Sequence, residues 1–201
     1  MNQKTFELIA GHPALDFVNT LDDRFQEGAP KELLESYADL VAFVEQAGLL
    51  TLKQGRELER AAMGKSGERV LRAAMVVREA LAAVLYAMID GRKTPAADLK
   101  KLTDWIQNTR QKLGLAPERG RFAWRLPAEV MPEMPLQLLA LSTEELLTSG
   151  WMELLRACAM EDCRWLFLDT SKNHTRRWCD MKICGNRVKA RRFKAQHRGR
   201  V

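Results

Sequence analysis

The sequence has few of the residue types and motifs that carry most enzyme chemistry. It contains three histidines in 201 residues, and it lacks the G-x-S-x-G, H-E-x-x-H and glycine-rich dinucleotide patterns. Gly64-Lys65-Ser66 resembles the end of a phosphate-binding loop, but that loop needs glycine where Glu59 stands. We therefore expect that the protein is not an enzyme.

Long apolar runs are also missing. The longest strongly apolar stretch without a charge, residues 80–89, is much shorter than the ~20 residues of a membrane-spanning helix. The N-terminal residues show no basic segment followed by an apolar run, which is the pattern of a signal peptide. We expect a cytoplasmic protein without a membrane partner.

Cysteine is absent from the first 157 residues and then occurs four times, in the pattern C-x4-C, fifteen residues, C-x4-C. Two close pairs of thiols are typical ligands of a structural Zn²⁺ ion. In a cytosolic chain, paired cysteines are metal ligands more often than disulfides. Two disulfides or four free thiols are the alternatives. The predicted zinc ligands are Cys158, Cys163, Cys179 and Cys184.

Positive charge is concentrated in the same part of the chain. From residue 164 onward there are twelve Lys or Arg and two Asp, which gives a charge of +10. Since the whole sequence carries +6, the preceding residues carry −4. This separation predicts that the C-terminal segment, and not the whole protein, contacts a polyanion.

The residues before the cysteines predict a mainly helical fold. Ser36 and Asp39 form a start like a capping box, and Gly48 is placed to end that helix. Residues 68–90 are apolar nearly all round and should lie at the centre. Helices are expected over residues 36–47, 51–64, 68–90 and 95–113, and again from Ser142 onward.

A minor β element is expected beside these helices. Residues 120–126 alternate apolar and polar side chains, which is typical of a strand, and residues 4–9 are its expected partner. The predicted fold class is mainly α with this small β element. We place a helical domain over residues 1–150 and a small four-cysteine zinc finger over residues 151–201.

Within the finger, residues 165–168 and 176–178 have strand character and should form a hairpin between the two cysteine pairs. The sequence after Cys184 contains good helix formers and no proline. A knuckle, a hairpin and a helix that carries the last ligand make up a treble-clef finger.

The run WLFLDTSKNHTRRWCDMKICGNRVKARRF resembles the CGNR zinc finger, which is named for the residues found here as Cys184, Gly185, Asn186 and Arg187. The segments LDFVNT, residues 15–20, and AGLL, residues 47–50, resemble the ABATE domain that usually precedes this finger in bacterial proteins. The resemblance covers nearly the whole chain. It implies a DNA-binding regulator of transcription that associates with the nucleoid.

The basic residues of the finger are the predicted DNA contacts. On a helix after Cys184 they would spread over more than half the circumference, while Val188 and Phe193 pack onto the finger. A solvated basic tail, an RNA-binding module that uses Trp165, Phe167 and Trp178, and an adaptor for an acidic protein are the alternatives. The predicted DNA contacts are Arg176, Arg177, Lys182, Arg187, Lys189, Arg191, Arg192 and Lys194.

The helical domain could sense a small-molecule effector or form a homodimer. Asp16 and Asn19 lie three residues apart in a mostly apolar segment, so they would share one face of a helix. With Trp124 they are the candidate ligand pocket. The alternative is that these polar groups are hydrogen-bonded parts of the core.

Overall fold

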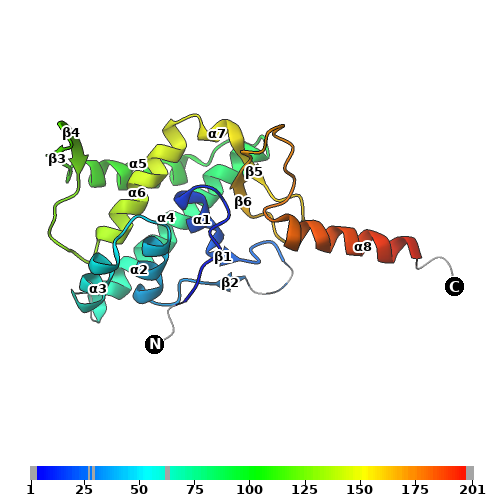
Figure 1. The fold of residues 1–201 in the computed structure, drawn as a ribbon, viewed down its shortest axis with the longest axis horizontal. Coiled ribbons are helices and arrows are strands. Elements are labelled where there is room, and N and C mark those ends of the chain that lie inside the picture. The colour runs from blue at the N-terminus through cyan, green and yellow to red at the C-terminus, as the bar shows by residue number, and fades with distance from the viewer. Residues whose placement is uncertain (1–3, 27, 29, 62–63, 198–201) are drawn as a thin grey trace.

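The computed structural model describes residues 4–26, 28, 30–61 and 64–197. The mainly helical fold with small sheets is confirmed. Figure 1 shows α4 running through the middle of the body, with α8 leaving it on the side opposite the β3–β4 hairpin. In chain order the elements are α1 (Pro13–Asn19), β1 (Leu21–Asp22), β2 (Lys31–Glu32), α2 (Tyr37–Gln46), α3 (Leu52–Ala61), α4 (Lys65–Ile89), α5 (Ala96–Arg110), β3 (Gly114–Glu118), β4 (Arg121–Arg125), α6 (Met134–Thr148), α7 (Trp151–Leu154), β5 (Leu155–Ala157), β6 (Leu166–Leu168), the π-helical turn η1 (Met181–Gly185) and α8 (Asn186–His197).

The expected capping box of α2 is present. The Ser36 hydroxyl accepts a hydrogen bond from the Asp39 backbone N–H at 3.1 Å, and the Asp39 carboxylate accepts one from the Ser36 N–H at 2.9 Å. Gly48 follows with φ of 75°, the left-handed conformation that ends a helix. Local sequence therefore fixes both ends of this helix.

The most apolar helix, α4, is central as expected. It packs against α1, α2, α5 and α6, and Ala74, Leu81 and Leu85 on it are fully buried. The apolar surface that these helices remove from water supplies most of the favourable free energy of folding.

Two expectations about the helical body are wrong. The partner of β4 is β3, and residues 4–9 form no strand. Arg119 and Gly120 both have positive φ, so a two-residue turn joins β3 directly to β4. Ser142 does not begin a helix, because it lies buried inside α6, which starts at Met134.

An ion-pair network around the buried Arg78 side chain holds β2 against α4 and the end of α1. The Arg78 guanidinium is buried and donates to both carboxylate oxygens of Glu32, at 2.7 and 2.6 Å. It also donates to the Thr20 hydroxyl at 3.0 Å and to Glu79 at 3.0 Å. Arg24 pairs with the same Glu79 carboxylate.

The finger and the helical body share one hydrophobic core. Leu166 and Phe167 of β6 are buried in the same cluster as Leu15 and Phe17 of α1. Strand β6 packs against α1, and β5 packs against α4. The boundary at residue 150 remains a prediction, and packing is continuous across it.

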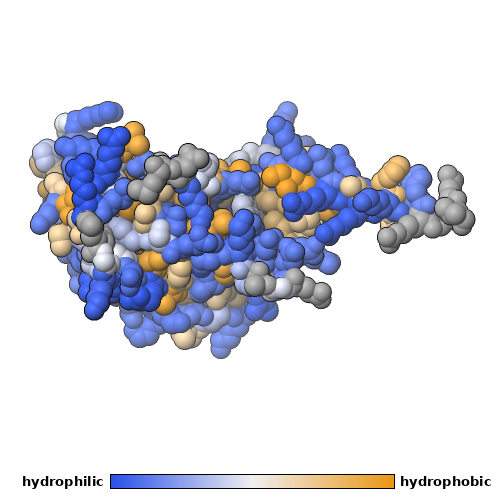
Figure 2. Space-filling model, turned by 90° about the horizontal axis from the view of Figure 1, so that it is seen from below, coloured by the Kyte–Doolittle hydropathy of each residue, from blue (hydrophilic) through white to orange (hydrophobic). Residues whose placement is uncertain are grey.

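The surface is largely hydrophilic in the view of Figure 2, including most of the projecting α8. Among the described residues, no helix combines the length and the apolar character that crossing a membrane requires.

Candidate metal centre and nucleic-acid interface

The first cysteine pair sits in the connection between β5 and β6. Cys158 follows β5 directly, and its N–H donates to the Trp165 carbonyl at 2.8 Å, which extends the pairing of the two strands. The chain then turns back, because the N–H groups of Cys163 and Arg164 both donate to the Met160 carbonyl at 3.0 Å. The two thiols are thereby brought to one side of this turn.

The hairpin of the finger differs from the expected one. Strand β6 pairs with β5, which precedes the first cysteine, and residues 176–178 form no strand. The backbone–backbone hydrogen bonding described for residues 176–178 is limited to one bond, from the Ala159 N–H to the Arg177 carbonyl at 2.8 Å. The two connections are of similar length, with eight residues between β5 and β6 and seven between β6 and residue 176. The Arg176 N–H donates to the Asp169 carboxylate at 2.8 Å, so it is not available to pair with β6.

The second cysteine pair is positioned by the turn η1. The Asp180 carboxylate accepts hydrogen bonds from the N–H groups of Lys182 and Ile183, at 2.5 and 3.0 Å. The Asn186 amide donates to the Lys182 carbonyl at 3.0 Å. Asn186 thus closes the turn that holds Cys184.

Gly185 packs closely against a side chain of the same turn. A Cβ atom at this position would lie 2.4 Å from the sulfur of Met181. Because the Met181 side chain is exposed and flexible, a larger residue at position 185 would shift this side chain.

The four thiols have the geometry of a structural zinc site. Their sulfur atoms all lie within 4.8 Å of one another, and they are free thiols. The sulfur of Cys179 lies 3.7 Å from that of Cys163 and 3.5 Å from that of Cys184. Tetrahedral Zn²⁺ with Zn–S bonds of about 2.3 Å places its ligands about 3.8 Å apart, so Cys158, Cys163, Cys179 and Cys184 fit the ion.

Crowding of the thiols opposes the ionisation of all four together in the absence of a cation: hydrogen bonding from the Cys163 thiol lowers the pKa of Cys158, whereas the pKa values of the other three are raised. Hydrogen bonding with the thiols of Cys158 and Cys163 raises the pKa of Cys179 above its usual range, and burial raises the pKa of Cys184. A bound Zn²⁺ supplies the positive charge that allows such thiols to become thiolates together.

Two family models match the sequence, and together they cover the helical body and the four-cysteine site. The model of the CGNR zinc finger matches residues 155–197, and the ABATE model, described as "Putative stress-induced transcription regulator", matches residues 11–150. The chain belongs to the ABATE family and carries a C-terminal CGNR finger. No curated protein matches the sequence. The two matched families are of regulator and zinc-finger types.

A buried carboxylate shapes the loop between the two cysteine pairs of the CGNR finger. Asp169 accepts hydrogen bonds from the hydroxyl and N–H of Ser171, at 2.5 and 3.1 Å, and from the N–H of Arg176 at 2.8 Å. The hydrogen bond from Ser171 is the main cause that lowers the pKa of Asp169. His174 lies exposed in this loop and is not among the metal-binding group.

The structure places Arg176 inside the finger. Its guanidinium lies over the ring of Phe167, 4.4 Å from the centroid, and donates to the backbone carbonyls of Trp178 and Cys179. These bonds favour a structural role over the predicted DNA contact. Arg177, in contrast, is exposed, 5.4 Å from the centroid of the Trp178 ring.

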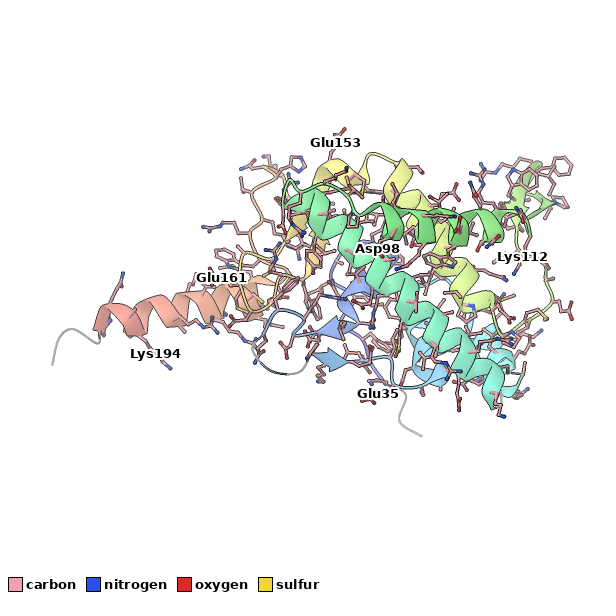
Figure 3. The ribbon with its side chains drawn as sticks, turned by 180° about the vertical axis from the view of Figure 1, so that it is seen from behind. Glu35, Asp98, Lys112, Glu153, Glu161 and Lys194 are labelled. Atoms are coloured by element: carbon pink, nitrogen blue, oxygen red, sulfur yellow. The ribbon has the colours of Figure 1, made fainter. Side chains whose placement is uncertain are left out.

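The remaining predicted DNA contacts lie in η1 and along α8. Lys182, Arg187, Lys189 and Lys194 are exposed, and Figure 3 shows Lys194 far from the body. Arg191 forms a salt bridge with Asp162 at 2.7 Å. Arg192 lies in α8, and its side chain falls outside the described part of the structure.

Of the two apolar residues of α8 expected to pack onto the finger, one does so and the other does not. Val188 packs partly against the core, as expected. Phe193 does not pack onto the finger: it is exposed and stacks on His197, with ring centroids 4.0 Å apart. Arg187 borders a cleft that is also lined by Asp22, Asp23 and Asp180, so acidic side chains surround it.

The predicted ligand pocket is not formed. Asp16 is buried and accepts a hydrogen bond from the Ala10 N–H at 3.0 Å, and burial raises its pKa to about 6. Trp124 is exposed on β4, at the edge of the molecule, whereas α1 lies near its centre (Figure 1). The structure therefore separates Trp124 from Asp16 and Asn19.

Asn19 instead joins the ABATE region to the CGNR finger. Its amide donates to the Leu166 carbonyl and accepts from the Leu166 N–H, both at 2.9 Å. Trp165 donates to Asp22 at 2.8 Å beside this pair. The sequence signal was the polar residue in an otherwise apolar segment, but nothing in the sequence showed that its partner lies 147 positions later.

We expect Asn19→Ala to lower the free energy of unfolding by about 2 kcal/mol, because two buried backbone groups of Leu166 lose their partners. Chemical denaturation of the zinc-loaded protein measures this change. Asn173→Ala removes an exposed asparagine in the finger loop and is the matched control, with an expected change below about 0.5 kcal/mol. Equal stability of the two variants would contradict the role assigned to Asn19.

Proposed function

We propose that the protein is a DNA-binding transcriptional regulator that presents α8 of its CGNR finger to duplex DNA. The observation that carries the proposal is the exposure of α8. This helix leaves the body with Lys189, Lys194 and Arg187 in solvent, and its described ion pairs are limited to the one between Arg191 and Asp162.

The dimensions of α8 suit a DNA groove. Its 12 residues correspond to a length of about 18 Å, and the major groove accepts a helix of this diameter. Lysine and arginine contacts to phosphates would supply most of the affinity and make it fall with salt. A sequence-specific contact would require one of the arginines to reach a guanine edge.

The zinc site and the body fix the direction of this helix. Cys184 lies in η1, two residues before the start of α8, so the metal would anchor the chain just ahead of the first turn of this helix. The bonds of Asn19 to Leu166, and of Tyr86 to the Arg164 carbonyl at 2.9 Å, hold the finger against the body. A helix that is positioned before binding loses less conformational entropy when it meets DNA.

The ABATE region would act as the sensor or dimerisation unit of the regulator. A cavity of about 740 Å³ lies between α2, α3 and the start of α4, and Tyr37, Arg56 and Glu59 contribute to its lining. This volume is within the range of small-molecule sites. An effector would bind here, away from Asp16, Asn19 and Trp124.

Burial of the finger's aromatic residues argues against the RNA-binding alternative in its original form. Phe167 and Trp165 are buried in the shared core, and Trp178 is partly buried. These rings are not available to stack on the bases of a single strand, as that alternative requires.

We expect Lys189→Ala/Lys194→Ala to weaken binding to any duplex and to flatten the plot of log affinity against log salt by about 1.8 units, since each lost phosphate contact removes about 0.9. Fluorescence anisotropy of a labelled duplex at several salt concentrations measures the slope.

Lys53→Ala/Lys65→Ala is the matched control, because it removes two exposed lysines from α3 and α4, on the far side of the body from α8. Its slope should equal that of the wild type. If both variants change the slope equally, the contact is one of overall charge and α8 is not the DNA-binding element. If neither binds less tightly, an acidic protein becomes the better candidate partner.

A further inference from the structure

The β3–β4 hairpin presents an apolar face to solvent. In its register Leu115 lies opposite Trp124, and Pro117 lies opposite Phe122. Because side chains alternate between the two faces of a sheet, these four residues share one face. Leu115, Phe122 and Trp124 are 62%, 72% and 63% exposed, respectively.

The opposite face of the hairpin is less exposed to solvent. Ala116 and Ala123, which pair with each other, are half-buried. A two-stranded hairpin is only marginally stable by itself in water, and exposed aromatic side chains are a frequent sign of a binding surface. The apolar face is therefore a candidate for a partner.

Basic side chains flank this face at the turn and before β3. Lys112 and Arg119 are exposed and form no salt bridge with any residue that the structure describes, whereas Arg121 shares the opposite face of β4 with Ala123. Arg125 is paired with Glu118 at 2.6 Å, so this pair contributes no net charge. An occupant that complements the face carries negative charge and offers flat, apolar surfaces.

A second copy of the chain fits these requirements poorly. Two aromatic side chains of about 150–250 Å² each, with one leucine and one proline, provide less than the ~800 Å² per partner of a stable interface. A twofold axis would also bring identical basic side chains toward one another. Charge complementarity therefore favours an anionic partner.

We propose that this face binds single-stranded nucleic acid, with bases stacked on Phe122 and Trp124 and phosphates contacted by Lys112 and Arg119. Phe122 and Trp124 are two residues apart on one strand, which separates them by about 6.8 Å on one face. Aromatic side chains on a sheet stack on unpaired bases in this manner, and a basic surround follows the backbone.

The hairpin site is separate from α8. Figure 3 shows Lys112, which precedes β3, and Lys194 of α8 at opposite ends of the molecule. The hairpin proposal does not rest on duplex binding by α8, and either can fail without the other.

The test uses the zinc-loaded full chain with Lys189→Ala/Lys194→Ala as background, so that α8 attracts the probes less. Labelled oligothymidine and oligouridine of about 20 nucleotides distinguish DNA from RNA, and anisotropy measures their affinities. Adding Phe122→Ala/Trp124→Ala is expected to weaken binding of one or both single strands at least about 30-fold, because two stacking contacts are lost. Adding Phe122→Tyr/Trp124→Phe keeps the rings and should change the affinity less than about threefold.

A second variant guards against loss of the hairpin itself. Arg119→Asn removes one charge, while Asn-Gly favours the same two-residue turn. Its salt slope for single strands should fall by about 0.7 units, the value for one phosphate contact.

Three results would overturn the proposal. One is an unchanged affinity for both single strands in Phe122→Ala/Trp124→Ala. Another is polyglutamate of equal charge competing as well as oligothymidine, which would make the contact one of charge alone. The third is a wild-type dimer in sedimentation that this variant converts to a monomer with no change in strand affinity, which would assign the face to self-association.

Discussion

Replacing Cys179 with serine is expected to abolish stoichiometric zinc binding and to lower the melting temperature of the whole chain. Loss of a structural metal is one of the few single changes that costs more than about 4 kcal/mol. For a chain of this length, that loss corresponds to a fall of roughly 8–16 °C. Cys179 lies within sulfur contact of both Cys163 and Cys184, so its removal opens the centre of the site.

The effect should reach beyond the finger. Zinc holds the turn before β6 and the turn before α8, and Leu166 and Phe167 of β6 belong to the same buried cluster as Leu15 and Phe17 of α1. If the finger unfolds, α1 loses its apolar cover, and Asn19 loses both hydrogen bonds to Leu166. We therefore expect one cooperative transition for finger and α1, and not an independent loss of the finger.

Metal analysis and thermal unfolding, with hydrogen exchange of the α1 amides, measure the three parts of this expectation. Adding a strong chelator to the wild type should reproduce the melting temperature of Cys179→Ser. Lys182→Ala, a nearby exposed residue in η1, is the control and should retain one zinc ion. A variant that melts like the wild type after losing its metal would show that zinc does not support the shared core.

What the sequence predicts well in this chain is local or depends on specific chemistry. Ser36, Asp39 and Gly48 mark the ends of α2 within a few residues of one another, so short-range rules suffice. The four cysteines are recognisable because few other functions need paired thiols at these spacings. Fold class and zinc chemistry both follow from such signals.

What it predicts poorly depends on partners that are distant along the chain. Residues 176–178 have strand character, yet β6 pairs with β5, and the Arg176 N–H donates to the Asp169 carboxylate instead of to a strand. Trp124 and Asp16 are residue types that often line a ligand pocket, but the hairpin and α1, which carry them, lie on different parts of the molecule. The same limit applies to Arg78, whose charge sits within the most apolar helix and gave no indication of its partner.

Arg78→Met is expected to lower the free energy of unfolding by about 3 kcal/mol. The guanidinium is buried, and its loss leaves the partly exposed Glu32 carboxylate facing α4 without its cation, which places the cost at the low end for a broken buried pair. The Thr20 hydroxyl loses a partner as well. Urea unfolding of the zinc-loaded protein provides the measurement. Arg72→Met is the matched control on the same helix: Arg72 pairs with Glu68 at 3.6 Å in solvent, and breaking an exposed pair should cost less than about 1 kcal/mol.

A double variant separates the cost of an unpaired charge from the value of the ion pair. If the carboxylate left behind causes most of the loss, Arg78→Met/Glu32→Leu should recover part of it, because a buried pair replaced by apolar side chains is often tolerated. If the pair itself supplies the stability, the free energy of unfolding of the double variant should be equal to or lower than that of Arg78→Met. Since Glu32 lies in β2 and Thr20 ends α1, the second result would show that this network, more than apolar packing, fixes the segment after α1. That segment carries Asp22, which accepts the hydrogen bond of Trp165 in the finger, so the same network would also help to set the position of the finger on the body.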